Sequence, residues 1–96
     1  MSLDLDNIRE ELDELNTEIV DVVERRMNLV TKVAEYKDEN DMQIVDEERE
    51  EVVKQKFEDI FQERDMPEGR GYELAELLIA TAVDHEEEML GRDIKR

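Results

Sequence analysis

Hydrophobic residues recur at helical spacing through the first 40 residues of the chain. Successive apolar positions are separated alternately by four and three residues, which is typical of a heptad seam along one face of a helix. One place in this pattern, between Val22 and Leu29, is occupied by Arg26. The seam consists of Ile8, Leu12, Leu15, Ile19, Val22, Leu29, Val33 and Tyr36. No glycine or proline interrupts it, so the pattern predicts one helix over about residues 6–38.

A helix of this length is too long for one small domain. About 33 helical residues span roughly 50 Å, whereas a compact domain of this size has a radius of gyration of about 12–13 Å. Its apolar seam therefore extends beyond anything that one copy of the chain can cover. The simplest partner is a second copy, so the length of the helix predicts a homodimer.

Two shorter helices follow a polar break at residues 38–41. Asp46 is a favourable N-cap, with acidic residues behind it in the first turn, and predicts a helix over about 46–64. A segment rich in glycine and proline precedes a third helix over about 68–90, whose apolar stripe is interrupted by Glu86. Strand-like alternation is missing throughout. The expected fold is all-α, with three helices per protomer, one of them very long, in a single domain over 1–96.

Strong acidity limits the possible partners. The formal net charge is −17 and 45% of residues are charged, which argues against nucleic acid and anionic membranes because phosphate contacts need a positive surface. The helical periodicity argues against disorder. A folded core in an acidic shell suits a high-salt cytoplasm, where screening weakens self-repulsion. We therefore expect a halophilic source, an archaeon, with an ordinary acidic protein as the alternative.

Cofactor and targeting signals are not visible in the sequence. The chain has no cysteine, no apolar run of the roughly 20 residues that span a bilayer, and no signal peptide, so we expect a cytoplasmic protein. His85 is the only histidine and lacks partners at ligand spacing. It is interpreted as a surface residue. The acidic runs lack a calcium-loop motif. Neither a metal nor another cofactor is expected.

Five charged residues fall on or beside the apolar stripes, namely Arg9, Arg26, Lys37, Arg49 and Glu86. Charge on a buried face must be paired or neutralised. In one interpretation the charges pair internally and only fix the helix register. In the other, several cations converge on a small polyanion, since planar arginine forks suit carboxylates. Spacing alone leaves both interpretations open.

The intervals between these residues carry a family resemblance. Lys37 follows Arg26 by eleven residues, and a D-x-x-R-E motif, Asp46 to Glu50, begins nine residues later. With Ile8-Arg9-Glu10 and the helix from Leu74 to Glu86, the chain resembles the all-helical class of chorismate mutases over nearly its whole length, as a monofunctional member. The resemblance implies an intertwined helical homodimer with two active sites. It also implies the cofactor-free rearrangement of chorismate to prephenate, on the route to phenylalanine and tyrosine.

The resemblance also implies residue roles. Arg26 and, across the interface, Arg9 of the partner subunit would bind the two substrate carboxylates. Lys37 would donate to the ether oxygen and a carboxylate. Glu50 and the backbone near Asp46 would hold the ring hydroxyl. Such an arrangement keeps the substrate close to its reactive geometry and meets the charge that grows on the ether oxygen with fixed donors.

Arg49 would line the site and orient the substrate, whereas two other positions depart from the common family pattern. Ala82 stands where a serine or threonine usually helps bind a carboxylate, and the neighbouring Thr81 is turned about 100° around the helix. Glu86 stands where many relatives have glutamine. An ionised carboxylate would repel the ether oxygen, so Glu86 must be protonated to donate a hydrogen bond. Activity is therefore expected to fall as Glu86 ionises.

The sequence is also compatible with two other functions. The same helical scaffold also supports isochorismate-pyruvate lyase, whose substrate carries similar groups. The other alternative is a non-catalytic, acidic coiled-coil module that binds a basic partner. That alternative predicts that Arg26 and Lys37 are paired within the protein and that no small anion binds.

Overall fold

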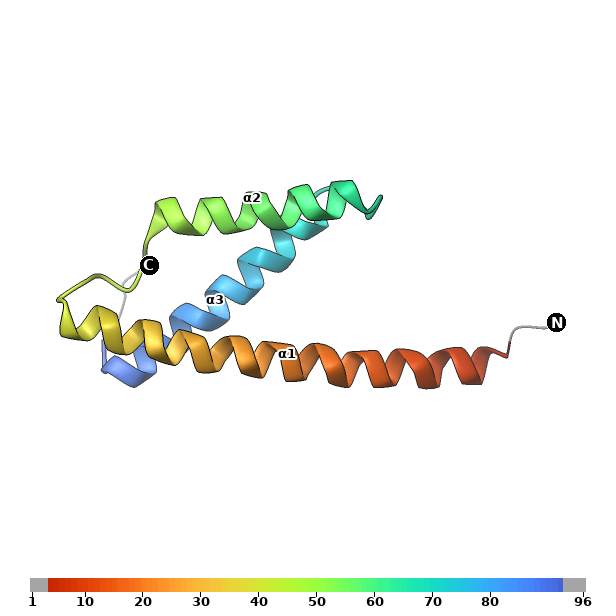
Figure 1. Cartoon of the computed structure of the whole chain (residues 1–96), viewed down its shortest axis with the longest axis horizontal. Helices are drawn as coiled ribbons and strands as arrows, with labels where there is room; N and C mark the ends of the chain where they lie inside the picture. The colour runs from red at the N-terminus through yellow and green to blue at the C-terminus, as the bar shows by residue number, and fades with distance from the viewer. Residues whose placement is uncertain (1–3, 93–96) are drawn as a thin grey trace.

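The computed structural model describes residues 4–92, and these residues form three α-helices. They are α1 (Leu5–Glu39), α2 (Glu47–Glu63) and α3 (Arg70–Leu90), which confirms the all-α class and the unusual length of the first helix (Figure 1). The third helix begins two residues later than position 68, because Gly69 has a left-handed backbone with φ of 83°. Gly91, also left-handed, follows the end of α3.

Short polar side chains set where the first two helices begin. Asp4 accepts a hydrogen bond from the Asp6 amide at 3.0 Å, and Asp46 accepts one from the Arg49 amide at 3.1 Å. The third helix has no such cap of its own. Glu58 of α2 accepts from the amides of Gly69 at 2.9 Å and Tyr72 at 3.1 Å instead. These bonds, with that from Gly69 foremost, lower the pKa of Glu58, so α2 supplies the negative charge that the start of α3 favours.

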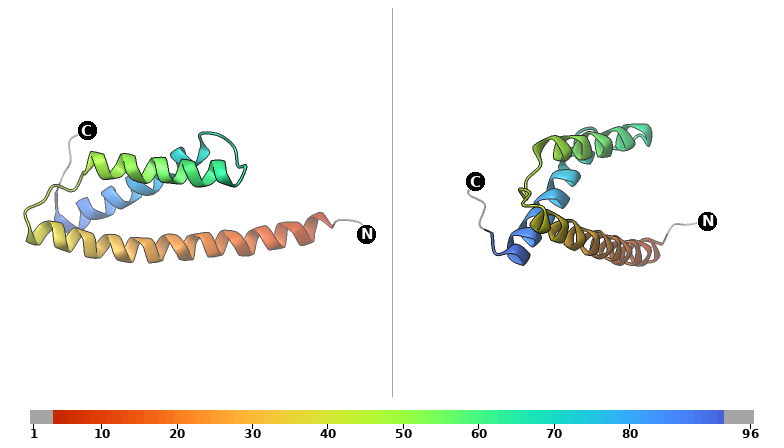
Figure 2. Two further views of the ribbon diagram at one scale, coloured as in Figure 1. Left: turned by 45° about the horizontal axis from the view of Figure 1, so that its top comes forward. Right: turned by 60° about the vertical axis from the view of Figure 1, so that its left-hand side comes forward.

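The three helices form an open arrangement rather than a closed bundle. Helix α3 packs against both α1 and α2, whereas α1 and α2 do not approach each other (Figure 2). The Cα radius of gyration is 17.0 Å and the molecule is 60 Å long, compared with about 12–13 Å for the radius of a compact domain of this size. The N-terminal end of α1 therefore extends past the other two helices (Figure 1).

Few apolar side chains are buried in the single chain. The buried ones are Ala34, Ile44, Ala75 and Val83. The seam of α1 is on the surface instead: Leu12 is 51% exposed, Ile19 60% and Leu29 62%. Fully burying one such side chain is worth about 1.5–3 kcal/mol, so the isolated chain leaves a large stabilising contribution unused. None of the described helices is both long enough and apolar enough to cross a membrane.

The contact between α1 and α3 includes a hydrogen bond between side chains that was not predicted from the sequence. The Thr31 hydroxyl donates to the Met27 carbonyl at 3.2 Å and lies 2.9 Å from Nε2 of His85. Because the hydroxyl proton is already used, Nε2 of His85 is the donor in the second bond. His85 is half-buried, so its interpretation as a surface residue was wrong.

A glycine allows the closest approach between α2 and α3. A Cβ atom on Gly71 would lie 2.6 Å from the Phe57 carbonyl oxygen and 2.9 Å from the Glu58 Cα. Both of those atoms belong to the α2 backbone, which cannot move aside as a flexible side chain does. The two helices can therefore pack at this distance only if position 71 has no side chain.

Replacing Gly71 with alanine is expected to destabilise the protein by about 1–3 kcal/mol through overpacking. In an ordinary helix interior the same change stabilises by about 1 kcal/mol. The sign of the change in the free energy of unfolding therefore distinguishes close helix packing from an ordinary helix position. Urea unfolding followed by circular dichroism measures it. Gly91→Ala is the comparison, because Cβ at position 91 meets open space and only the left-handed backbone is strained. A stabilising effect of Gly71→Ala would contradict the helix packing described above.

Candidate active site

A cavity of about 190 Å³ lies where the three helices meet the connection between α1 and α2. Seven of the eight residues predicted to form the site line it: Arg26, Lys37, Asp46, Arg49, Glu50, Ala82 and Glu86. They come from all three helices and from the N-cap of α2. The eighth, Arg9, is not among the lining residues; it precedes Arg26 by 17 residues on the same helix, which places it about 25 Å away.

The remaining walls of this cavity are apolar. They are formed by Val30, Val33, Ile44, Val53, Ile79 and Val83, none of which was predicted as a site residue. The seam of the first helix already contained Val33, but its periodicity did not indicate a cavity. Val83 of α3 is only 7% exposed.

Lys37 and Glu86 form an ion pair inside this cavity. Nζ of Lys37 lies 3.1 Å from Oε2 of Glu86, and the two side chains are 14% and 6% exposed. The same ammonium donates to the Ile44 carbonyl at 2.6 Å. An ammonium has three donors, so these two partners leave one for a ligand. Lys37 lies in the last turn of α1, where the helix dipole also favours a cation.

Arg26 and Arg49 lack such a partner. Within residues 4–92, neither guanidinium has a carboxylate within salt-bridge distance, and the one hydrogen bond from Arg26 reaches the Leu78 carbonyl at 3.5 Å. The internal pairing expected of a purely structural module is therefore present for Lys37 and missing for Arg26. Two arginines with free forks at one cavity can bind carboxylates in the bidentate manner.

The polar residues near these cations differ in their burial and in their hydrogen bonds. Glu50 is half-buried, whereas the carboxylate of Asp46 is used in capping α2. Thr81 cannot replace the hydroxyl that Ala82 lacks, because Thr81 is exposed and its hydroxyl donates to the Leu77 carbonyl at 2.8 Å. Among the described residues, no group of three or more histidine or acidic side chains is placed to hold a metal ion.

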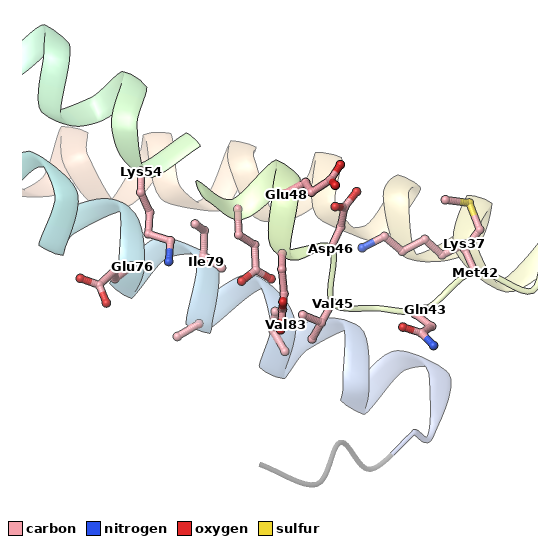
Figure 3. A pocket seen from close by; sticks show the side chains of 13 residues that line it. Lys37, Met42, Gln43, Val45, Asp46, Glu48, Lys54, Glu76, Ile79 and Val83 are labelled. Carbon is pink, nitrogen blue, oxygen red and sulfur yellow. The ribbon is translucent and has the colours of Figure 1, made fainter. Parts of the chain in front are cut away.

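A larger and more open groove of about 950 Å³ adjoins the small cavity (Figure 3). It shares Lys37, Asp46, Glu50, Ile79 and Val83 with the cavity, and its other lining residues are acidic, polar and apolar side chains together with Lys54. Figure 3 shows Lys37 pointing from α1 towards Asp46, with Lys54 on the opposite side of the groove. Acidic residues line both the groove and the cavity, whereas Arg26 and Arg49 line only the cavity.

The sequence profile described as chorismate mutase type II matches residues 8–87. The chain belongs to this family. Membership makes the protein an isomerase and implies conversion of chorismate to prephenate, a step of aromatic amino acid biosynthesis. The matched range includes every residue that lines the small cavity, and Arg9 as well. In the same comparisons, no curated protein and no solved structure matched the chain.

The geometry of the cavity suits the family's reaction. Chorismate carries two carboxylates, and arginine side chains without carboxylate partners can bind such anions. The rearrangement is intramolecular, so an enzyme accelerates it by holding a compact conformation and by stabilising the charge that develops on the ether oxygen. The cations and apolar walls of the small cavity can supply both effects.

Proposed function

We propose that the small cavity is the catalytic site for the rearrangement of chorismate and that it works within a homodimer. The observation that carries this proposal is the convergence of Arg26, Lys37 and Arg49 on one partly apolar cavity in a chain of net charge −17. Arg26 is half-buried and lacks a carboxylate partner within residues 4–92, and an anionic substrate would compensate its charge. Among the activities considered, a reaction of a small dicarboxylate accounts best for this arrangement.

The proposed roles follow the positions around the cavity. Arg26 binds one substrate carboxylate, and Lys37 donates its third hydrogen to the ether oxygen and a carboxylate. Glu50 and the backbone at Asp46 hold the ring hydroxyl, while Arg49 lines the site and orients the substrate. Ala82 contributes a wall but no hydrogen bond, so substrate affinity is expected to be lower than it would be with a hydroxyl there.

The remaining cation in the proposal is the partner's Arg9. Three features support this arrangement: the exposed seam of α1, the length of α1 beyond the other helices, and the position of Arg9 about 25 Å from Arg26 on its own helix. The cavity is also smaller than the roughly 300–1,000 Å³ of ordinary ligand sites, as expected when one wall comes from another subunit. Pairing the two seams antiparallel brings the N-terminal part of one α1 to the other cavity.

The experiment that tests this function follows the loss of chorismate absorbance in the ultraviolet, with isochorismate assayed in parallel. Turnover of chorismate to prephenate is expected. Turnover of isochorismate alone would assign the chain to the lyase reaction, and failure of both substrates would favour a non-catalytic acidic module. High salt belongs in the assay buffer, because screening reduces the self-repulsion of the acidic chain.

Glu86 is proposed to act in its protonated form, which makes a specific prediction about pH. An ionised Glu86 repels the ether oxygen and also competes with the substrate for Lys37, which it contacts at 3.1 Å. Glu86→Gln is therefore expected to make kcat depend less on pH, because an amide donates at every pH. The measurement is kcat against pH for both proteins. An identical pH profile in the variant would remove this role from Glu86.

We also propose that this chain forms one mutase domain that acts in the cytoplasm of a halophilic archaeon. The support is compositional: 30 acidic residues against 13 lysines and arginines. If the acidic shell is an adaptation to salt, the melting temperature should rise by at least 10 °C between about 0.1 M and 2 M KCl, because screening weakens like-charge repulsion. Calorimetry at the two salt concentrations measures the shift. A melting temperature independent of salt would favour an ordinary acidic protein.

A further inference from the structure

Arg92, just beyond the end of α3, bridges two parts of the chain near the proposed site. Its Nη1 donates to the Met42 carbonyl at 2.7 Å, and its Nη2 lies 3.0 Å from Oδ1 of Asp38. Asp38 belongs to the last turns of α1, whereas Met42 belongs to the connection, residues 40–46, between α1 and α2. One planar guanidinium thus holds three segments of the chain together.

The end of α3 aims Arg92 at these partners. Gly91 adopts a left-handed conformation with φ of 63°, and the Arg92 amide donates back to the Glu87 carbonyl at 3.1 Å. This is the hydrogen bond by which a chain turns sharply after a helix. The direction of the Arg92 side chain is therefore set by local backbone geometry.

The connection that Arg92 holds also positions Lys37. The Ile44 carbonyl accepts from the Lys37 ammonium at 2.6 Å, and Ile44 is only 4% exposed. Asp41, in the same connection, has a positive φ of 52°, which is unfavourable for a residue other than glycine. A strained segment keeps this conformation only if other contacts hold it. Figure 3 shows Met42 and Val45 along this connection, next to Lys37.

We propose that Arg92 is a positioning residue for catalysis: by holding Met42 and Asp38, it fixes the connection so that the Ile44 carbonyl keeps the Lys37 ammonium aimed into the cavity. Its two hydrogen-bond partners, Asp38 and Met42, do not line the small cavity, so Arg92 acts through the connection. The expected effect on catalysis rests on the proposed function. The expectation that Arg92 holds the connection does not depend on it.

The test compares Arg92→Ala with Arg70→Ala. Arg70 lies at the opposite end of α3, pairs with Glu73 at 2.7 Å, and lines neither the small cavity nor the groove. Both changes remove one ion pair of the surface, which contributes little to stability. Arg92→Ala is expected to lower kcat about tenfold with little change in KM, because a displaced Lys37 loses its effect on the transition state. Arg70→Ala should leave kcat within twofold.

A second measurement is independent of activity. Hydrogen exchange of the peptide covering residues 40–46 should accelerate about tenfold in Arg92→Ala and remain unchanged in Arg70→Ala, because only the first change releases the connection. Arg92→Lys should lie between wild type and alanine in both measurements, since an ammonium keeps the charge but not the planar fork.

The possible results separate the two proposals. If the wild type turns over no chorismate, the proposed function fails, and exchange of residues 40–46 still tests the connection. If the wild type is active but Arg92→Ala matches Arg70→Ala in both kcat and exchange, the positioning role of Arg92 is overturned. Faster exchange with unchanged kcat would likewise overturn it, because the connection would then be held without consequence for Lys37.

Discussion

Arg26→Ala is expected to lower kcat/KM for chorismate by roughly a thousandfold, on the order of 4 kcal/mol of transition-state stabilisation. Arg26 lines the small cavity and has no carboxylate partner among the described residues. In the proposed complex, its removal leaves a substrate carboxylate buried without a charge partner, and that is more costly than losing an exposed contact. The rate of chorismate loss under subsaturating conditions measures the effect directly.

Arg25→Ala is the matched control for this change. Arg25 is the preceding residue of the same helix and is exposed, whereas Arg26 is half-buried. Both substitutions remove one positive charge and replace arginine with an excellent helix former, so they change net charge and helix propensity equally. Arg25→Ala should keep kcat/KM within twofold. Equal losses in the two variants would indicate a general effect of charge and would contradict the role of Arg26.

Arg9→Ala is expected to reduce kcat/KM to a similar extent, although Arg9 lies about 25 Å from Arg26 on its own helix. The reason is the proposed dimer, in which Arg9 supplies a carboxylate contact to the partner's cavity. Arg25→Ala serves again as the control, since it is an exposed arginine on the same helix. Sedimentation must show that the variant still dimerises. A fully active Arg9→Ala dimer would exclude Arg9 from the site.

Periodicity predicted the helices well because each one depends on local rules. The long seam of α1 and the N-cap at Asp46 each depend only on nearby residues, and the structure contains both. The start of α3 was less predictable. Its cap comes from Glu58, eleven residues before Gly69, and such a tertiary contact has no local sequence signal.

The candidate site was likewise predictable from the sequence only in part. Its charged members were visible because charge on an apolar stripe is unusual, and their intervals match a family pattern. The contacts between them were not visible. The bond from Lys37 to the Ile44 carbonyl and the bridge formed by Arg92 both depend on how the connection folds between two helices. The contact of His85 with Thr31 spans 54 positions of sequence, so no periodicity within α3 indicates it.

Exposure of the seam has a consequence for stability as well as for catalysis. Most of the apolar residues that define α1 remain at the surface of a single chain, and the acidic surface adds repulsion. In the proposed dimer, the same α1 contact buries the seam and completes two sites. Folding, dimerisation and activity should then be lost together on dilution.

Mixing Arg9→Ala chains with Lys37→Ala chains tests the shared site most directly. Each parent dimer lacks one required cation in both sites, whereas a hybrid dimer has one intact site, built from Lys37 of one chain and Arg9 of the other. Random pairing of equal amounts makes half of the dimers hybrid, so the account predicts about a quarter of wild-type activity after unfolding and refolding together. Activity that stays at the level of the separate parents, despite hybrid dimers seen by native mass spectrometry, would contradict it.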